Sequence, residues 1–283
     1  MDIAKIVEKK VQETIDKYGL FTKKDKILVA LSGGKDSVTV LYVLKKLGYE
    51  VDAFYLDLHI GDWSKKNLIA VQELCKLLAV KLTVVDIRAE LGSSMCFIHK
   101  GIKSKKPNLS NCLICGVIKR SLLNKKAREL GATKIATGHN LDDEVEVYFM
   151  NLFKYNSDLL WGMGPQNGVT RDKKFVPRIK PLYFVTNKET KEFTQELKLP
   201  VVYEKCPCSS TSGIRNDIRK MVQELEKENP NLKKELIEKL QEKIKNKNFK
   251  VSGKITYCEK CGEPARGKIC KSCDLFSSLC KSE

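Results

Sequence analysis

The sequence predicts an α/β fold in which a parallel sheet carries helices on both faces. Short apolar runs of strand length alternate with longer segments whose apolar residues recur at helical spacing. Such alternation is typical of parallel sheets, because each return crossing uses a helix. With 42% hydrophobic residues among 283, the chain can bury one main core and carry appendages.

The predicted elements follow from the apolar pattern and from the Gly, Pro and polar residues between them. Strands are expected over 26–31, 49–62, 80–87, 134–140, 175–185 and 201–204. Helices are expected over 1–19, 38–47, 64–78, 111–130, 142–153, 187–199 and 213–246, the last broken at Pro230. A cysteine-rich tail follows.

The loop SGGKDS, residues 32–37, has the composition of a phosphate site. A helix N-terminus offers unpaired backbone N–H groups and favours an anion, and two glycines let the backbone come close to it. Lys35 adds a mobile positive charge. Asp36 would repel phosphate unless a cation lay between them, so it suggests Mg²⁺. The plainer alternative is a Gly-containing turn in which Asp36 caps the helix.

Polar residues also follow later strands, where ligands bind in such folds. Asp57 and His59 end the second strand and can line a nucleoside pocket, although His59 suits a surface position equally well. In TGHNLDDEVE, residues 137–146, two aspartates open a helix. We expect Asp142 to cap that helix and Asp143 to take part in metal binding or acid/base chemistry.

The cysteines form two groups. The tail pattern Cys258-x2-Cys261-x8-Cys270-x2-Cys273 predicts a tetrahedral structural zinc site, a small zinc ribbon. The second group is dispersed: Cys112 and Cys115 open a helix, whereas Cys206 and Cys208 follow the last strand. Its spacing alone fits an iron–sulfur cluster, a second zinc, or a redox or persulfide pair. If residues 206–208 are extended, both thiols there face the same way.

The formal charge of +17 favours a polyanionic partner such as nucleic acid, although a lysine-rich proteome would also give it. The stretch HKGIKSKKPN, residues 99–108, holds five basic residues if His99 is protonated, and no acid. We expect no membrane partner, because no apolar run reaches the roughly 18 residues of a membrane span. Eleven cysteines without an export signal favour a cytoplasmic location.

SGGKDS resembles the pyrophosphate loop of the N-type ATP pyrophosphatases, whose fold is adenine nucleotide alpha-hydrolase-like (PP-loop). GHNLDDE, CGVIKR and EKCP extend the resemblance to the TtcA/TtuA family of iron–sulfur-dependent tRNA thiolases, on its TtuA-like branch. The resemblance implies cleavage of ATP between its α and β phosphates. It implies an ATP site made of Leu31, Ser32, Gly33, Gly34, Lys35, Asp36, Ser37, Asp57, His59 and Gly138.

The same resemblance implies a 4Fe-4S cluster held by Cys112, Cys115 and Cys206, with the fourth iron open to sulfide. It implies catalytic roles for Asp36, Lys119 and Asp143. The activity expected is 2-thiouridine synthesis: a tRNA uridine is adenylated by ATP, and sulfur from sulfide or a sulfur-carrier protein replaces its C2 oxygen. The alternatives are 2-thiocytidine synthesis, another adenylating tRNA modification, and a non-catalytic zinc-dependent RNA-binding protein. A homodimer is compatible with the sequence.

These expectations divide the chain into four parts. Residues 1–19 form an N-terminal helix, and residues 20–208 form the pyrophosphatase domain with its cluster cysteines. Residues 209–250 form a helical segment, and residues 251–283 form the zinc-binding tail.

Overall fold

The computed structural model describes residues 2–167, 172–209, 213–246 and 256–277. Its main sheet has six strands in the order β3-β2-β1-β4-β6-β5. The strands are β1 Ile27–Leu31, β2 Val51–Asp57, β3 Leu82–Asp86, β4 Lys134–Ala136, β5 Gln166–Asn167 and β6 Arg178–Ile179. Every pairing is parallel except that of edge strand β5 with β6, so the predicted parallel sheet is confirmed.

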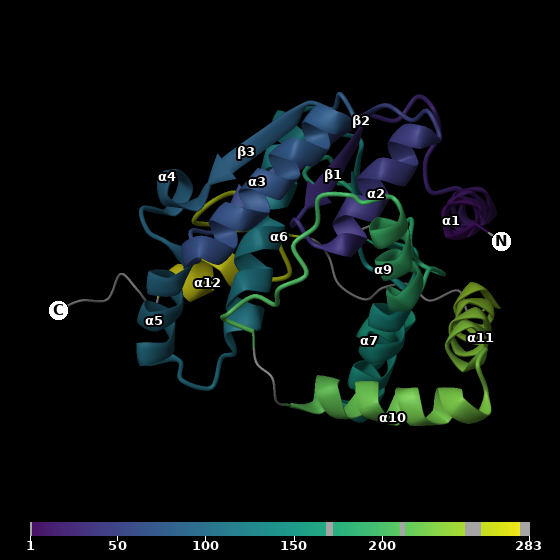
Figure 1. Ribbon diagram of the computed structural model, residues 1–283. Coiled ribbons are helices and arrows are strands. Elements are labelled where there is room, and N and C mark those ends of the chain that lie inside the picture. Colours follow the sequence, from purple (N-terminus) through teal and green to yellow (C-terminus); the bar gives the residue numbers. More distant parts are fainter. Residues whose placement is uncertain (1, 168–171, 210–212, 247–255, 278–283) are drawn as a thin grey trace.

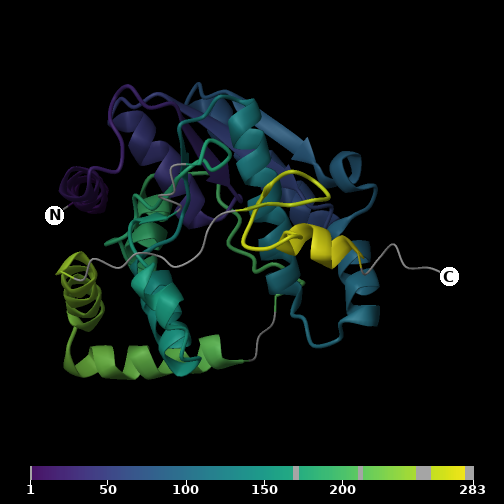
Figure 2. The same ribbon diagram turned by 180° about the vertical axis from the view of Figure 1, so that it is seen from behind.

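Helices cover both faces of this sheet (Figures 1 and 2). One face packs against α1 Ile3–Tyr18, α2 Lys35–Lys46, α3 Gly61–Leu77 and α9 Asn187–Glu196. The other packs against α4 Ile87–Leu91, α5 Met95–Lys105, α6 Asn111–Glu129 and α12 Lys271–Ser277. Strand β1 contributes side chains to the cores on both faces of the sheet. Val29 packs in the core under α1 and α2, and Leu28 packs in the core under α6.

The direction in which successive strands are added to the sheet reverses beside β1. From β1 the chain moves outward through β2 and β3, then returns through α6 to β4 on the opposite side of β1. In parallel sheets such a reversal separates the two loops that follow the neighbouring strands and creates a ligand site there. The loop before α2 and the loop after β4 are the two loops concerned.

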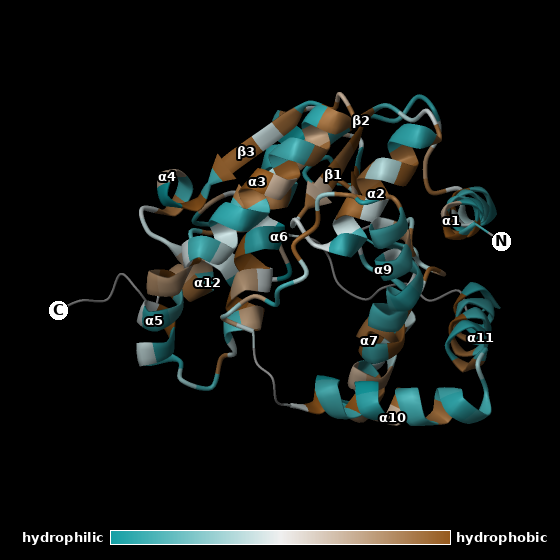
Figure 3. Ribbon diagram, viewed as in Figure 1, coloured by the Kyte–Doolittle hydropathy of each residue, from teal (hydrophilic) through white to brown (hydrophobic). Residues whose placement is uncertain are grey.

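A second helical unit lies beside the sheet. It contains α7 Leu141–Phe153, α8 Ser157–Trp161, α10 Ile214–Glu228 and α11 Leu232–Asn246. Figure 1 shows α10 crossing the end of α7. Figure 3 shows α10 and α11 mainly hydrophilic, with apolar residues confined to part of each helix, such as Ile218 and Ile237 in the shared core. The break predicted at Pro230 is confirmed, because it separates α10 from α11.

One buried carboxylate, held by two half-exposed arginines, joins α10 to α7. The carboxylate of Glu146 on α7 is 3% exposed and pairs with Arg215 and Arg219 of α10, at 2.9 and 2.7 Å. Removing one partner of a buried ion pair is costly, since the remaining charge is left desolvated. This shared carboxylate therefore fixes where α10 lies.

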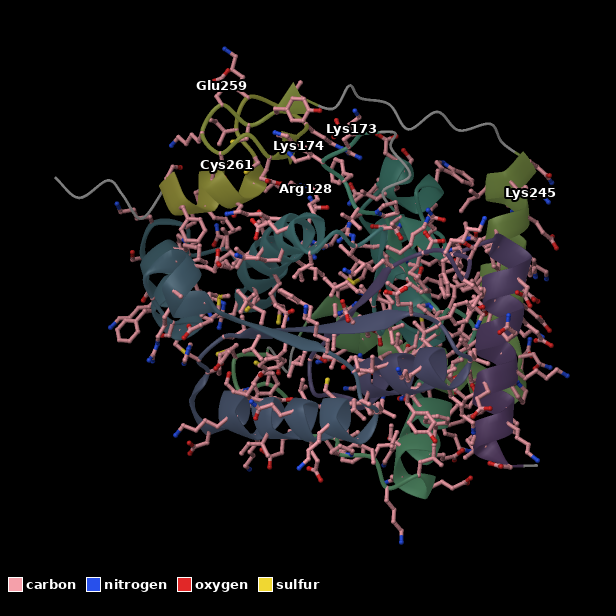
Figure 4. The ribbon with its side chains drawn as sticks, turned by 90° about the horizontal axis from the view of Figure 1, so that it is seen from above. Arg128, Lys173, Lys174, Lys245, Glu259 and Cys261 are labelled. Atoms are coloured by element: carbon pink, nitrogen blue, oxygen red, sulfur yellow. The ribbon has the colours of Figure 1, made fainter. Side chains whose placement is uncertain are left out.

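The tail is fastened to the core (Figure 4). It contains β7 Thr256–Tyr257, β8 Pro264–Ala265 and α12. Arg128 of α6 binds Glu263 through both Nη atoms, and Lys174 Nζ donates to the carbonyl of Gly262 at 2.6 Å. Leu275 of α12 is buried in the layer beneath α6. The tail thus supports the helix that carries the paired cysteines.

Some predicted elements differ from the structure. Residues 201–204 form no strand, although Val202 N donates to the carbonyl of Gly33 at 3.0 Å. The strand predicted over 175–185 shrinks to β6, because Pro177 and Pro181 limit its backbone donors. The predicted segment boundary near 250 and the end of the tail lie outside the described residues. In the described part of the chain, no helix has the length and apolar character needed to cross a membrane.

Gly138 lets the two loops touch. A Cβ there would lie 2.8 Å from the backbone nitrogen of Ser37 and 3.0 Å from the carbonyl carbon of Asp36. We predict that Gly138→Ala lowers the free energy of unfolding by about 1–3 kcal/mol, because backbone must move. Gly164→Ala is the control, since its Cβ would meet neighbours at 3.6 Å and should cost below about 0.5 kcal/mol. Equal urea midpoints for the two variants would contradict the packing.

Candidate functional site

The SGGKDS loop closes tightly against the first face of the sheet. Gly33 has φ +81°, and a Cβ there would lie 2.2 Å from Asn67 Oδ1. Glycine is therefore required by both backbone conformation and space. Ser37 Oγ donates to the carbonyl of Gly34 at 2.9 Å and accepts from Ser32 N at 3.1 Å. These bonds hold the turn in place at the N-terminus of α2.

A polar network joins this loop to α7 and α9. Asp36 Oδ1 accepts from Lys35 Nζ at 2.6 Å, from Asn140 Nδ2 at 3.1 Å and from Thr190 Oγ1 at 2.7 Å. Lys35 Nζ also donates to Asn187 Oδ1 at 2.6 Å. Asn140 is fully buried and caps α7. Three helix starts or first turns therefore meet at one carboxylate.

The two adjacent aspartates of α7 have different environments. Asp142 accepts from Asn187 N at 2.7 Å and pairs with Lys233 of α11 at 2.6 Å. It links three helices rather than capping its own. The cap is Asn140, whose capping box is completed by Asp143: Asp143 Oδ2 accepts from Asn140 N at 3.4 Å. The capping role expected for Asp142 is thus wrong, because the helix begins one residue earlier.

Asp143 lies close to the Asp36 network. Burial raises the pKa of its carboxyl to about 6, Arg215 opposes that rise, and the charges of Asp36 and Glu146 reinforce it. A carboxyl that titrates near neutral pH can hold or accept a proton under working conditions. Nearby, desolvation and surrounding cations lower the pKa of His139 to about 4.

Asp57 and His59 line a hollow at the ends of β2 and β3. Its volume is about 180 Å³, and its walls include Ser64, Lys65 and Arg88. His59 has φ +50°, and its Nε2 lies 2.8 Å from Asp86 Oδ1. The imidazole of His59 thus contacts the carboxylate of Asp86. The residues that line the hollow are mainly polar.

The first turns of α6 bring one dispersed cysteine group together. Cys112 and Cys115 lie three residues apart after the N-cap Ser110, and the thiols of Cys112 and Cys206 are near enough to influence that of Cys115. Burial raises the pKa of Cys115 to about 11, and the Lys119 ammonium acts in the opposite direction. Cys115 Sγ lies 3.3 Å from Nε2 of the buried His99, a contact not anticipated from the sequence.

Residues 206–209 form a turn, closed by Ser209 N donating to the carbonyl of Cys206 at 2.9 Å. The expectation of an extended segment with both thiols on one side is wrong, because Pro207 starts this turn. The thiol of Cys208 lies near those of Cys96 of α5, Cys206 and Cys115. Sequence spacing could not reveal that proximity.

The tail cysteines converge on one point. The Sγ atoms of Cys258, Cys261, Cys270 and Cys273 all lie within 4.8 Å of one another. Four thiolates at about 2.3 Å from one ion require S···S separations near 4 Å, so this arrangement fits tetrahedral zinc. Within the described residues this is the one set of three or more metal-ligating side chains that converges so closely.

The basic stretch 99–108 is less uniform than its sequence suggests. His99 is buried and burial lowers its pKa, so it adds no positive charge to the surface. Lys106 pairs with Asp274 of the tail at 2.9 Å. Lys100, Lys103 and Lys105 remain exposed on α5.

The network residues Asn140, Asn187 and Thr190 were not singled out from the sequence. The T-x-x-E capping box of Thr186 and Glu189 marks the start of α9, yet it gives no sign that this helix reaches the loop before α2.

The pKa of Asp143 predicts a pH signature. Because the folded carboxyl titrates near 6 and the unfolded one near 3.8, the folded state holds the extra proton between these values, and stability falls as pH rises through that range. Asp143→Asn cannot ionise, so its stability should not fall with pH for this reason. We predict that the variant gains on the order of 2 kcal/mol over wild type between pH 4 and 7 in urea titrations without added divalent cation. A difference independent of pH would mean that Asp143 is ionised throughout.

Comparison with known proteins agrees with this geometry. The PP-loop domain family matches residues 3–226. The tRNA-5-methyluridine(54) 2-sulfurtransferase of Pyrococcus horikoshii is 36% identical over 270 residues, which span 95% of this chain and 84% of the relative. The enzyme of the same name from Thermotoga maritima is 34% identical over 271 residues, 95% of this chain and 86% of the relative.

Among solved structures, the U34-tRNA thiolase NcsA from Methanococcus maripaludis with its [4Fe-4S] cluster superposes with a TM-score of 0.81. The match covers 99% of this chain and 89% of the other, at 24% sequence identity, and so supports the fold. The strand–SGGKDS–helix unit, the reversal beside β1 and the two sulfurtransferase relatives lead to one conclusion: the chain belongs to the PP-loop family of ATP-binding domains, in the group that contains the tRNA 2-sulfurtransferases.

Proposed function

We propose that this protein is an ATP-dependent tRNA sulfurtransferase that makes 2-thiouridine. The observation that carries the proposal is the position of two sites at the same region of one fold: a phosphate loop on α2 and a cysteine group on α6. Its relatives in P. horikoshii and T. maritima are named for sulfur transfer to a tRNA uridine derivative. A cytoplasmic location follows for an enzyme that depends on reduced thiols.

The loop side supplies activation. Leu31, Ser32, Gly33, Gly34, Lys35, Asp36 and Ser37 would receive the ATP phosphates together with Gly138, while Asp57 and His59 would face the nucleoside. Lys35 now rests on Asp36 and Asn187, and phosphate oxygens would attract its ammonium away from them. In the described residues Asp36 accepts hydrogen bonds through Oδ1 alone, so Oδ2 suits Mg²⁺, with Asp143 close by.

In the first step the uridine C2 oxygen forms a bond to the α-phosphorus, and the bond to the β-phosphate oxygen breaks. Pyrophosphate leaves over the loop, where backbone N–H groups and Lys35 stabilise its charge. Asp143 is placed to take a proton, since its pKa is near 6. In the second step sulfide forms a bond to C2, and AMP departs with the original oxygen.

Cys112, Cys115 and Cys206 fit a 4Fe-4S cluster better than a second zinc ion. They do not converge as the tail cysteines do among the described residues, and a cluster of several irons spans more than one ion does. When bound, such a cluster supplies an iron position at which sulfide can be held. Lys119 lies near Cys115, where its ammonium favours thiolate and sulfide anions.

Helix α5 presents a surface suited to the tRNA. Phe97 is 71% exposed, and Lys100 and Lys103 are exposed on the same helix, next to the cysteine group. An aromatic ring beside cations offers base stacking together with phosphate attraction. The zinc site in the tail would stabilise α6 and α5 through Arg128 and Lys106. The intact hydrogen-bond network around Asp36 favours a catalytic protein over an RNA-binding protein that has lost its activity.

Activation is tested by Lys35→Ala and Asp36→Asn. We predict that each lowers tRNA-dependent release of pyrophosphate from ATP at least about 100-fold, because charge stabilisation of the leaving group is lost. Lys45→Ala, at the exposed end of the same helix, is the control and should leave the rate within about twofold. Wild-type rates in either loop variant would refute the assignment.

The ligand set is tested by comparing two neighbouring cysteines. We predict that Cys206→Ala fails to retain iron after anaerobic reconstitution, whereas Cys208→Ala retains four irons and its charge-transfer absorption. The reason is that the resemblance to the thiolases assigns the third ligand position to Cys206, in EKCP. If Cys208→Ala loses iron while Cys206→Ala keeps it, the two roles must be exchanged.

A further inference from the structure

Two arginines lie near each other on the side of the sheet that α6 covers. Arg178 of β6 stands beside Ile135 of β4, which packs beneath α6, while the next residue, Ile179, packs on the opposite face. Arg178 therefore projects toward α6, since successive strand residues alternate in direction. Arg120 is on α6, and its guanidinium lies back over Gly116, with Nη1 3.0 Å from where a Cβ would be.

Four cations surround His139, and two of them are matched by acids. Lys180 pairs with a buried glutamate of α7 at 2.6 Å, and Arg215 pairs with another at 2.9 Å. The other two cations near His139 are Arg120 and Arg178. Neither has a carboxylate partner among the described residues.

Two neighbouring guanidinium groups repel each other when no negative charge lies between them. Arg178 is partly buried, Arg120 lies on the exposed side of α6, and the charge of Arg120 opposes that of Arg178. Arginine stays protonated in proteins, so the repulsion cannot be relieved by losing a proton. A planar guanidinium fork matches the oxygens of a phosphate group, and two forks would balance its charge.

We propose that Arg120 and Arg178 form a second anion site, which binds the α-phosphate of the nucleotide: the phosphate that AMP keeps. This inference deepens the proposed function and rests on it. Cleavage between the α and β phosphates gives two anions that must be held apart. Lys35 holds one at the loop, and the arginine pair holds the other. Arg120 lies five residues after Cys115 on α6, so AMP attached to the uridine oxygen would be held beside the cysteine group.

The test measures binding of AMP, adenosine and pyrophosphate to the full-length, anaerobically reconstituted protein. Arg120→Gln and Arg178→Gln should each reduce the preference for AMP over adenosine about tenfold or more, because a charged hydrogen-bond donor is lost. Pyrophosphate affinity should change less than about twofold. Arg219→Gln is the matched control, because its guanidinium already has Glu146 as partner, and it should preserve the preference. Unchanged AMP preference in both pair variants overturns the proposal.

A thermal measurement guards against misfolded variants. Without ligand, Arg178→Gln should melt at or above the wild-type temperature, because a repulsion is removed. AMP should raise the melting temperature of wild type and of Arg219→Gln but not of Arg178→Gln. Stabilisation of Arg178→Gln by AMP equal to that of wild type would contradict the site.

Two further outcomes are informative. One distinguishes a nucleotide phosphate from a tRNA phosphate, and the other distinguishes failure of the anion site from failure of the proposed function. If Arg178→Gln weakens tRNA binding while the AMP preference persists, the pair holds a tRNA phosphate and the proposal is wrong. If wild type fails to thiolate tRNA yet the AMP preference depends on the pair, the anion site stands and the proposed function fails.

Discussion

The rest of the site depends on one carboxylate, Asp36, and on the buried Asn140 that binds it. Through Oδ1, Asp36 connects the first turn of α2 to the cap of α7 and to Thr190 of α9. A buried amide must satisfy its hydrogen bonds within the protein, so Asn140 fixes the distance between the loops on either side of β1. Gly138 makes that closeness sterically possible. Lys35 shares the network, and an entering phosphate would exchange one set of partners for another without moving the helices.

Positively charged side chains lie at three places in this region of the fold. Lys35 lies at the loop, Arg178 lies on the sheet face that α6 covers with Arg120 on α6 itself, and Lys119 lies beside the thiols. Helix α6 carries both Arg120 and Lys119, so its position would couple the proposed nucleotide and sulfur sites. The tail holds the other end of this helix through Arg128 and the buried Leu275. The tail, whose four cysteines converge as metal ligands do, thus helps to position the helix that carries Cys112 and Cys115.

The sequence was informative wherever a local pattern determines structure. The α/β alternation, the helix after SGGKDS, the break at Pro230 and the tail metal pattern were all predictable, because period, breaker residues and ligand spacing act over short distances. Contacts between distant segments were not predictable. Asn187 reaches Lys35 and Thr190 reaches Asp36 only because α9 packs on α2. Cys208 lies near Cys96 because the chain turns at Pro207. Burial removed His99 from the basic surface, an effect that charge counting cannot reveal.

The central claim is that the uridine C2 oxygen is activated by transfer of AMP at the SGGKDS loop and leaves with AMP when sulfur arrives. The most direct test uses tRNA labelled with heavy oxygen at the uracil C2 position, incubated with ATP, sulfide and the reconstituted protein. The account predicts that each uridine thiolated yields one AMP carrying the heavy oxygen in its phosphate, with unlabelled pyrophosphate. Thiolated tRNA accompanied by unlabelled AMP, or by label in pyrophosphate, would contradict it.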